Sequence, residues 1–251
     1  GSGCGAAAPA APAGSGTASQ SAAAAAVQTA QKERITDQWS LEKTVRGEMI
    51  GVMKLNIHVP QLVCDSPDAE YINNELAAMY AADFRQYEDS PEIEPQQDEW
   101  CPQIYIDWDA YWYGDCVSLV MRDRYGGTAP WRYSGWCFDF ASGNQLTATQ
   151  MLQRMGADPV ALEEALYRDV KRRDELDRQT ACERGLLPPD SLKEGNTAWW
   201  ATLDELPLSF DEAGNVSFVV RRSSAAQEQY TDDKVTIPLD AQPLPQDWEW
   251  Q

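Results

Sequence analysis

Residues 115–152 read DCVSLVMRDRYGGTAPWRYSGWCFDFASGNQLTATQML, and this stretch carries the most regular pattern in the chain. Apolar residues alternate with polar ones on both sides of Gly126-Gly127: Val117, Leu119 and Met121 before the pair, and Trp136, Phe138 and Phe140 after it. Such alternation around a glycine turn is typical of two half-buried antiparallel strands. Ser142-Gly143-Asn144 follows as a second turn, so the stretch predicts a hairpin that leads into a helix.

The segment before this hairpin alternates even more strictly. One side would carry Ile104, Ile106, Trp108, Ala110 and Trp112, and the other would carry Tyr105, Asp107, Asp109, Tyr111 and Tyr113. We therefore expect a strand from Gln103 to Tyr113, joined to the hairpin by a turn at Gly114-Asp115.

A helix is predicted from Pro67 onward, because Ser66 is a suitable N-cap and proline suits the first helical position. Its apolar face would consist of Ile72, Leu76, Met79, Tyr80 and Phe84. Before this helix we expect strands over residues 39–45 and 50–59, the second ended by Pro60. After the hairpin we expect helices over 149–155 and 158–183, and strands over 206–210, 216–220 and 234–239.

This order of elements predicts an α+β fold with antiparallel sheets and packed helices, arranged as one domain or as two subdomains. We divide the chain into a flexible Gly/Ala/Ser/Pro tether at residues 1–35, an N-terminal α/β subdomain at 36–114, a C-terminal subdomain at 115–240 and a tail at 241–251. The tail either docks through Trp248 and Trp250 or frays.

Composition restricts the classes of partner. The chain has 251 residues, of which 43% are hydrophobic, which is enough for a core. Forty acidic residues against 20 basic ones give a formal charge of −20 and a pI near 4.3. This charge repels phosphate backbones and anionic lipids, so nucleic acid is excluded as a partner. The charge serves either solubility or the attraction of a cationic partner.

The first residues indicate how the chain would be held in the cell. No apolar run approaches the roughly 20 residues that span a bilayer, so we expect a soluble chain. The low-complexity stretch after Cys4 cannot bury enough surface to fold alone. A Gly-Cys pair before such a stretch is similar to the lipid-modified cysteine of a bacterial lipoprotein, and leftover cloning sequence is the alternative. Contact with a membrane is expected only through a lipid on Cys4.

The other cysteines do not form a metal motif. None of them makes a CxxC pair, so no metal site is predicted. Cys116 and Cys137 lie about equally far from Gly126-Gly127, on the polar faces of the two predicted strands. A cross-strand disulfide between them is feasible, and reduced buried thiols are the alternative.

Sequence motifs for catalysis and cofactors are missing. His58 is the single histidine and lies in a predicted strand, where a structural role is favoured over a catalytic triad. No GxSxG, GxGxxG or phosphate-binding loop is present, so no cofactor is predicted. Asp107 and Asp109 would lie roughly 6 to 7 Å apart on one strand face. That spacing suits a glycosidase or calcium, although a solvated strand face also produces it.

The same strand face is a candidate binding surface. Its aromatic residues are Tyr105, Tyr111 and Tyr113, and Trp131 and Tyr133 follow the Gly-Gly turn nearby. Rings beside carboxylates can stack on sugars and bond their hydroxyls, or anchor a basic protein. The alternative is that these rings pack in the core.

The order of motifs resembles the extracytoplasmic RsiV-like domain, found in an anti-sigma factor and beside the catalytic domain of the peptidoglycan deacetylase PdaC. The resemblance covers about Ile50 to Leu239, and residues 115–240 form its RsiV-like subdomain. It rests on HVPQLV at 58–63, Ile72-Asn73, YGGTAP at 125–130, FDFASGNQLTATQML at 138–152 and VTIPL at 235–239. Relatives commonly have a histidine after the glycine pair, and nothing that depends on it carries over to this chain.

The resemblance implies a cell-envelope binding or sensing domain without catalytic activity, on the cell surface or in the periplasm. The expected partner is a cationic protein such as lysozyme, or cell-wall glycan. Two alternatives are an enzyme acting on cell-wall sugars through Asp107 and Asp109, and a passive structural lipoprotein.

Overall fold

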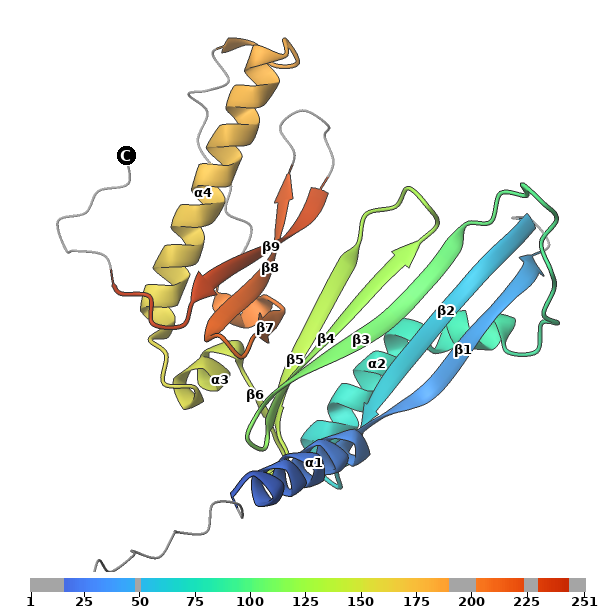
Figure 1. Cartoon of the computed structure of the whole chain (residues 1–251). Helices are drawn as coiled ribbons and strands as arrows, with labels where there is room; N and C mark the ends of the chain where they lie inside the picture. The colour runs from blue at the N-terminus through green and yellow to red at the C-terminus, as the bar shows by residue number, and fades with distance from the viewer. Residues whose placement is uncertain (1–15, 48–50, 190–201, 224–229, 244–251) are drawn as a thin grey trace, which may run out of the picture.

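The computed structural model describes residues 16–47, 51–189, 202–223 and 230–243, and it confirms the α+β class (Figure 1). Two sheets are present in this part of the chain, one with six strands and one with three. Helix α2 packs on the six-stranded sheet and helix α4 packs on the three-stranded sheet, and we call these two parts the first and the second lobe.

The first lobe contains the six-stranded sheet, whose strands follow one another in sequence order. They are β1 (Ile35–Gly47), β2 (Gly51–Leu62), β3 (Gln103–Tyr113), β4 (Cys116–Tyr125), β5 (Arg132–Asp139) and β6 (Asn144–Leu146). The predicted hairpin is confirmed as β4 and β5, which pair antiparallel with Leu119 opposite Trp136.

The strands pair antiparallel, as predicted, except at one place. Strands β2 and β3 run parallel, with Leu55 beside Ile104 and Ile57 beside Ile106. The connection between them contains helix α2 (Pro67–Tyr87), which returns the chain to the same end of the sheet. The sheet is therefore mixed. Pro60 also lies inside β2 and does not end it, because β1 has a register shift at Asp37, opposite Pro60.

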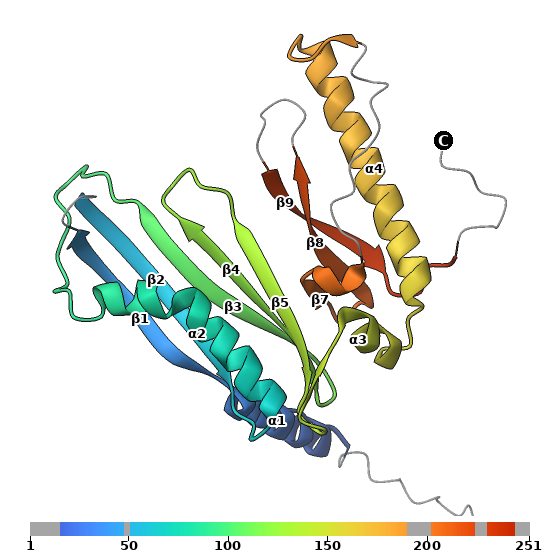
Figure 2. The same cartoon turned by 180° about the vertical axis from the view of Figure 1, so that it is seen from behind.

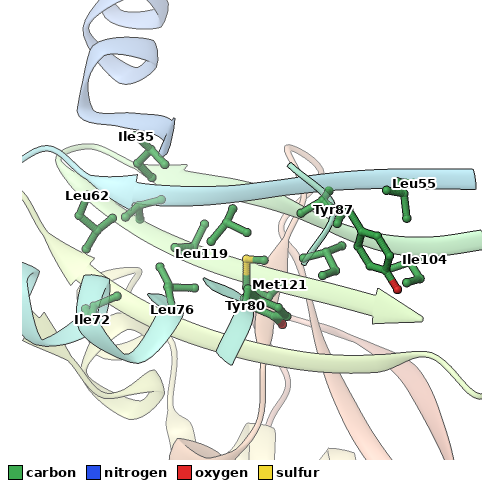
Figure 3. Close-up of a cluster of buried hydrophobic side chains, with 14 of the residues drawn as sticks. Ile35, Leu55, Leu62, Ile72, Leu76, Tyr80, Tyr87, Ile104, Leu119 and Met121 are labelled. Carbon is green, nitrogen blue, oxygen red and sulfur yellow. The ribbon is translucent and has the colours of Figure 1, made fainter. Parts of the chain in front are cut away.

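Helix α2 covers one face of this sheet, as Figure 2 shows from behind. Its N-cap is Ser66, whose hydroxyl accepts a hydrogen bond from the backbone N–H of Ala69. Ile72, Leu76 and Tyr80 point into the core, where they meet Leu119 and Met121 of β4 (Figure 3). Met79 was predicted on the apolar face, but it is 41% exposed because it lies at the border of the buried stripe.

The second lobe contains helices α3 (Ala148–Arg154) and α4 (Pro159–Glu183) and the three-stranded sheet. Its strands are β7 (Leu208–Phe210), β8 (Asn215–Ser223) and β9 (Tyr230–Pro238), all antiparallel. A capping box at Thr147 and Gln150 starts α3, and Asp158 caps α4. Val216, Phe218, Val235 and Ile237 form the core of this lobe together with Leu162 and Leu166 of α4.

The structure divides the chain differently from the predicted boundary at residue 115. Strands β3 and β4 pair along their whole length across that position. Apart from Cys116 and Cys137, which pack into the second cluster, the two hydrophobic clusters separate between Phe140 and Leu146, just before α3. The division lies there because the β3–β4 turn is a tight hairpin within one sheet and not a linker between subdomains.

Part of the predicted flexible tether is a helix, α1 (Gly16–Arg34). Alanine has the highest helix propensity, and the run of alanines at 22–26 favours this outcome. The end of the helix is fixed to the first lobe, since Arg34 pairs with Asp115 at 2.8 Å and lies over the ring of Phe140. Cys4, Trp248 and Trp250 lie outside the described residues. No helix among those described is long and apolar enough to cross a membrane.

Candidate binding face between the two sheets

The face of β3 turned away from α2 carries the predicted site residues. Alternation along the strand places Tyr105, Asp107 and Asp109 there, and all three side chains are half-buried. The antiparallel register sets Arg124 opposite Tyr105 and Arg122 opposite Asp107. Two arginines that the sequence prediction did not include therefore belong to the site. The two arginines alternate with Met121 and Asp123 along β4, and this pattern could have predicted that they share one face of the strand.

Arg122 joins the two carboxylates that were predicted as a pair. Its Nη2 atom lies 3.7 Å from Asp107 Oδ2 and 3.6 Å from Asp109 Oδ2. The guanidinium also lies over the ring of Tyr105, 5.6 Å from the ring centre. The Tyr105 hydroxyl donates a hydrogen bond of 2.9 Å to Asp107 Oδ2. Arg122 thus offsets one of the two carboxylate charges, and Arg124 on the same face offsets the other.

Trp131 extends the face toward the loop between β4 and β5. Its ring meets that of Tyr105 edge to face, with ring centres 5.1 Å apart. Arg124 lies over Trp131 and donates hydrogen bonds to the backbone oxygens of Ala129, at 2.8 Å, and Gly127. The loop with Gly126-Gly127 is thus held against the face through Arg124.

Tyr133 lies where the face meets the second lobe. It lines a pocket of about 280 Å³ together with Pro207, Val219 and the ion pair of Arg221 and Asp232. The Arg221 Nε atom lies 3.0 Å from Asp232 Oδ1, so the far wall of the pocket offers a donor and an acceptor. We call the set Tyr105, Asp107, Asp109, Arg122, Arg124, Trp131 and Tyr133 the aromatic face.

Two predicted site residues have other surroundings. Tyr111 packs against Phe210 of β7, with ring centres 6.0 Å apart, so it belongs to the contact between the lobes. Tyr113 is 46% exposed at the end of β3, eight residues along the strand from Tyr105 and outside the aromatic face.

The phenols of this region remain protonated at neutral pH. Burial raises the pKa of Tyr105, Tyr111 and Tyr133 above the ordinary value. The carboxylate of Asp107 raises the pKa of Tyr105 further, and that of Asp109 does so for Tyr111. The hydroxyls of Tyr111 and Tyr133 therefore keep a proton that they can donate, whereas the proton of Tyr105 is already donated to Asp107.

Of the two alternatives for Cys116 and Cys137, the structure has reduced buried thiols and not the candidate disulfide. The register explains this, because Cys116 lies opposite Asp139 and Cys137 lies opposite Ser118. Their strand face was expected to be polar, but the second lobe covers it and both residues join its core. Burial raises the pKa of Cys137 to about 11, which makes it a poor nucleophile.

His58 is held between two acidic side chains on the outer face of β1 and β2. Its Nδ1 atom lies 2.9 Å from Asp37 Oδ2, and its Nε2 atom lies 2.6 Å from Glu42 Oε1. Asp37 also accepts a hydrogen bond of 2.6 Å from Trp108 Nε1. This network fastens β1 to β2 and β3. No group of three or more His, Cys, Asp or Glu side chains in the described ranges is arranged to hold a metal ion.

No protein-family model matches the chain, and no curated protein matches its sequence. Among solved structures, the chain is similar to a DUF3298 family protein from Pseudomonas aeruginosa PAO1, with 18% sequence identity. The alignment covers 81% of this chain and 89% of that one, with a TM-score of 0.37. A TM-score this low does not establish a shared fold, so the resemblance to the RsiV-like domain stays a prediction.

Proposed function

We propose that the chain is a non-catalytic binding domain that recognises cell-wall glycan outside the cytoplasm through the aromatic face. The observation that carries this proposal is the position of Arg122 between Asp107 and Asp109. A glycosidase needs two carboxyl groups with the sugar carbon or a water molecule between them. Here a guanidinium group contacts both carboxylates, which favours binding over hydrolysis.

The chemistry of the face suits a ligand with many hydroxyl groups. Phenol hydroxyls and guanidinium groups donate hydrogen bonds, and the carboxylates accept them. Small ligands commonly bind in concave pockets that are lined by aromatic rings and a few polar groups. The compensated local charge makes this face a weaker candidate for binding a cationic protein.

The extracytoplasmic location is part of the proposal. It is supported by the Gly3-Cys4 pair and the Ala-, Gly-, Ser- and Pro-rich residues that follow it. Metabolic labelling with a fatty-acid analogue tests the lipid anchor. The label should be incorporated into the natural protein and lost in Cys4→Ala.

Binding can be tested by titrating the full chain with soluble N-acetylglucosamine oligomers and with muropeptides in a calorimeter. We expect Trp131→Ala and Tyr133→Ala each to weaken binding about tenfold, the loss typical of one important contact residue. The matched control is Tyr71→Ala, because Tyr71 is a 55% exposed tyrosine on α2. Equal affinity of all three variants, or absence of binding to every sugar tested, would refute the assignment of the face.

The rival enzyme is tested in the same samples. Incubation with purified peptidoglycan should leave the chromatographic profile of muropeptides unchanged. If fragments are released, and Asp107→Asn or Asp109→Asn abolishes their release, the chain is an enzyme and the proposal is wrong. If a pulldown with the chain recovers nothing from an envelope extract, a passive structural role is favoured.

A further inference from the structure

A second surface lies on the opposite face of the six-stranded sheet, where α2 ends and β3 begins. It is a pocket of about 400 Å³ whose walls are mainly apolar. Its floor includes Met53 of β2, Tyr87 of α2 and Ile104 of β3. Tyr87 and Ile104 are neighbours at one end of the core in Figure 3. Ile104 and Tyr105 point to opposite faces of β3, so this pocket is separate from the aromatic face.

Trp100 stands at the edge of this pocket with 73% of its surface exposed. Among the large hydrophobic residues that the structure describes, it is the most exposed. An indole beside an apolar pocket is unfavourable in water, and tryptophan is the residue type most enriched among the strong contacts of protein interfaces.

The loop that carries Trp100 is fixed to the sheet by groups other than the indole. The backbone N–H of Ile93 donates to Thr44 O at 2.9 Å, and that of Lys54 donates to Pro102 O at 2.9 Å. The Lys43 ammonium group donates to Glu88 O at 2.9 Å. Trp100 is therefore presented by an anchored loop and does not itself hold the loop in place.

The same loop concentrates negative charge. Residues 88–99 contain six acidic residues and no basic residue: Glu88, Asp89, Glu92, Glu94, Asp98 and Glu99. Within the described residues, the one ion pair of this loop joins Glu99 to Arg46 at 3.3 Å. In α4, by contrast, Asp169, Asp174 and Asp177 all pair with arginines. Among the described residues, the acidic side chains of this loop thus have fewer ion-pair partners than those of α4.

We infer that this pocket docks a segment of a basic protein, in which an aromatic or large aliphatic side chain is flanked by lysines or arginines. The apolar side chain would enter the pocket beside Trp100, and the basic residues would face the loop at 88–99. Charge complementarity identifies the occupant, because an acidic or neutral segment would leave the loop charges without partners. This docking goes beyond the proposed glycan function and does not depend on it.

The experiment uses the full chain and fluorescein-labelled synthetic peptides, with binding followed by anisotropy at low and high salt. The first peptide has a tryptophan between two runs of three lysines. A second has serine in place of the tryptophan, and a third has glutamates in place of the lysines. We expect only the first to bind well, and Trp100→Ala to weaken its binding about tenfold without changing the binding of the serine peptide. Because Trp100 is largely exposed, this variant should fold.

Two charge variants distinguish the effect of the acidic loop from the effect of the total negative charge of the protein. One variant carries Glu92→Gln, Glu94→Gln and Asp98→Asn, and a matched variant carries Glu33→Gln, Glu183→Gln and Glu212→Gln. All six side chains are exposed, and both variants lose three charges. The loop variant should weaken binding of the first peptide several-fold more than the matched variant does. Equal effects of the two variants, or no effect of Trp100→Ala, would overturn the inference.

Discussion

Asp123 shows how much one buried charged residue can contribute to this fold. It accepts hydrogen bonds from the Tyr80 hydroxyl at 2.9 Å and from Arg132 Nε at 2.7 Å. Its side chain is only 3% exposed, and burial together with Asp123 raises the pKa of Tyr80 far above its ordinary value. The carboxylate thus links β4 to both α2 and β5.

We predict that Asp123→Ala lowers the free energy of unfolding by roughly 3 kcal/mol, because a buried hydroxyl and a guanidinium lose their acceptor. Urea unfolding of the full chain measures this. The control is Asp115→Ala, which breaks the exposed pair with Arg34 and should cost less than about 1 kcal/mol. Similar losses in the two variants would contradict the role given to Asp123.

His58 gives the fold a dependence on pH. Burial lowers the pKa of the imidazole, but hydrogen bonds to Asp37 and Glu42 and the charges of Asp37 and Asp107 outweigh it, so the pKa lies above 6.5. The protonated ring then stabilises the folded state fully below pH 6.5, and this contribution is lost as the pH rises through the folded-state pKa.

We therefore expect the melting temperature of the natural chain to exceed that of His58→Gln most clearly at pH values below 6.5. The difference should shrink as the pH rises. Scanning calorimetry of both proteins across this range provides the measurement. A difference that stays constant with pH would show that the ring acts without its charge.

The turn between β5 and β6 depends on its contact with the start of α2. Gly143 has a φ of +74°, and a Cβ atom there would lie 3.0 Å from Ser66 Cβ. Gly214, in the turn between β7 and β8, has a φ of +82° but no neighbour within 4 Å of such an atom. Both glycines need a positive φ, but only Gly143 lies close to a neighbouring residue, Ser66.

Gly143→Ala should therefore destabilise the protein more than Gly214→Ala. Both substitutions force an L-residue into the left-handed region at a cost of about 1 to 2 kcal/mol. Gly143→Ala should lose roughly a further 1 kcal/mol, because it also displaces the N-cap of α2. Denaturant unfolding of the pair gives the comparison, and equal losses would mean that the turn can move away from Ser66.

Most helices and strands were predictable because their signals are local. Ser66 and Pro67 start α2, Asp158 starts α4, and strict alternation defines β3. The parallel pairing of β2 and β3 was not predictable from these patterns. Alternation indicates which side chains share a face of a strand, but it contains no information about the direction of the neighbouring strand.

The contact between the two lobes is close at Gly135. A Cβ atom on this residue of β5 would lie 3.0 Å from Pro207 Cα, which is a backbone atom of the second lobe. Ser118 of β4 also donates a hydrogen bond to the backbone oxygen of Leu208. The pocket beside Tyr133 includes Pro207, so the spacing of the lobes sets its width.

We predict that Gly135→Ala separates the lobes and costs about 1 to 3 kcal/mol of stability, as overpacking commonly does. Small-angle scattering should show a larger radius of gyration, and glycan binding at Tyr133 should weaken. Gly127→Ala is the control, since nothing lies within 4 Å of a Cβ atom there. An unchanged radius of gyration for Gly135→Ala would show that the interface adjusts without opening.

The order of residues along the chain was enough to predict the α+β class, the β4–β5 hairpin, the face shared by Tyr105, Asp107 and Asp109, and the N-cap of α2 at Ser66. These features depend on neighbours a few residues apart. The strand register brought Arg122 to the two aspartates, and the packing of the second lobe converted the supposedly polar face at Cys116 and Cys137 into core. Such outcomes depend on which distant segment covers a face, and that is decided when apolar surfaces far apart in sequence are buried together.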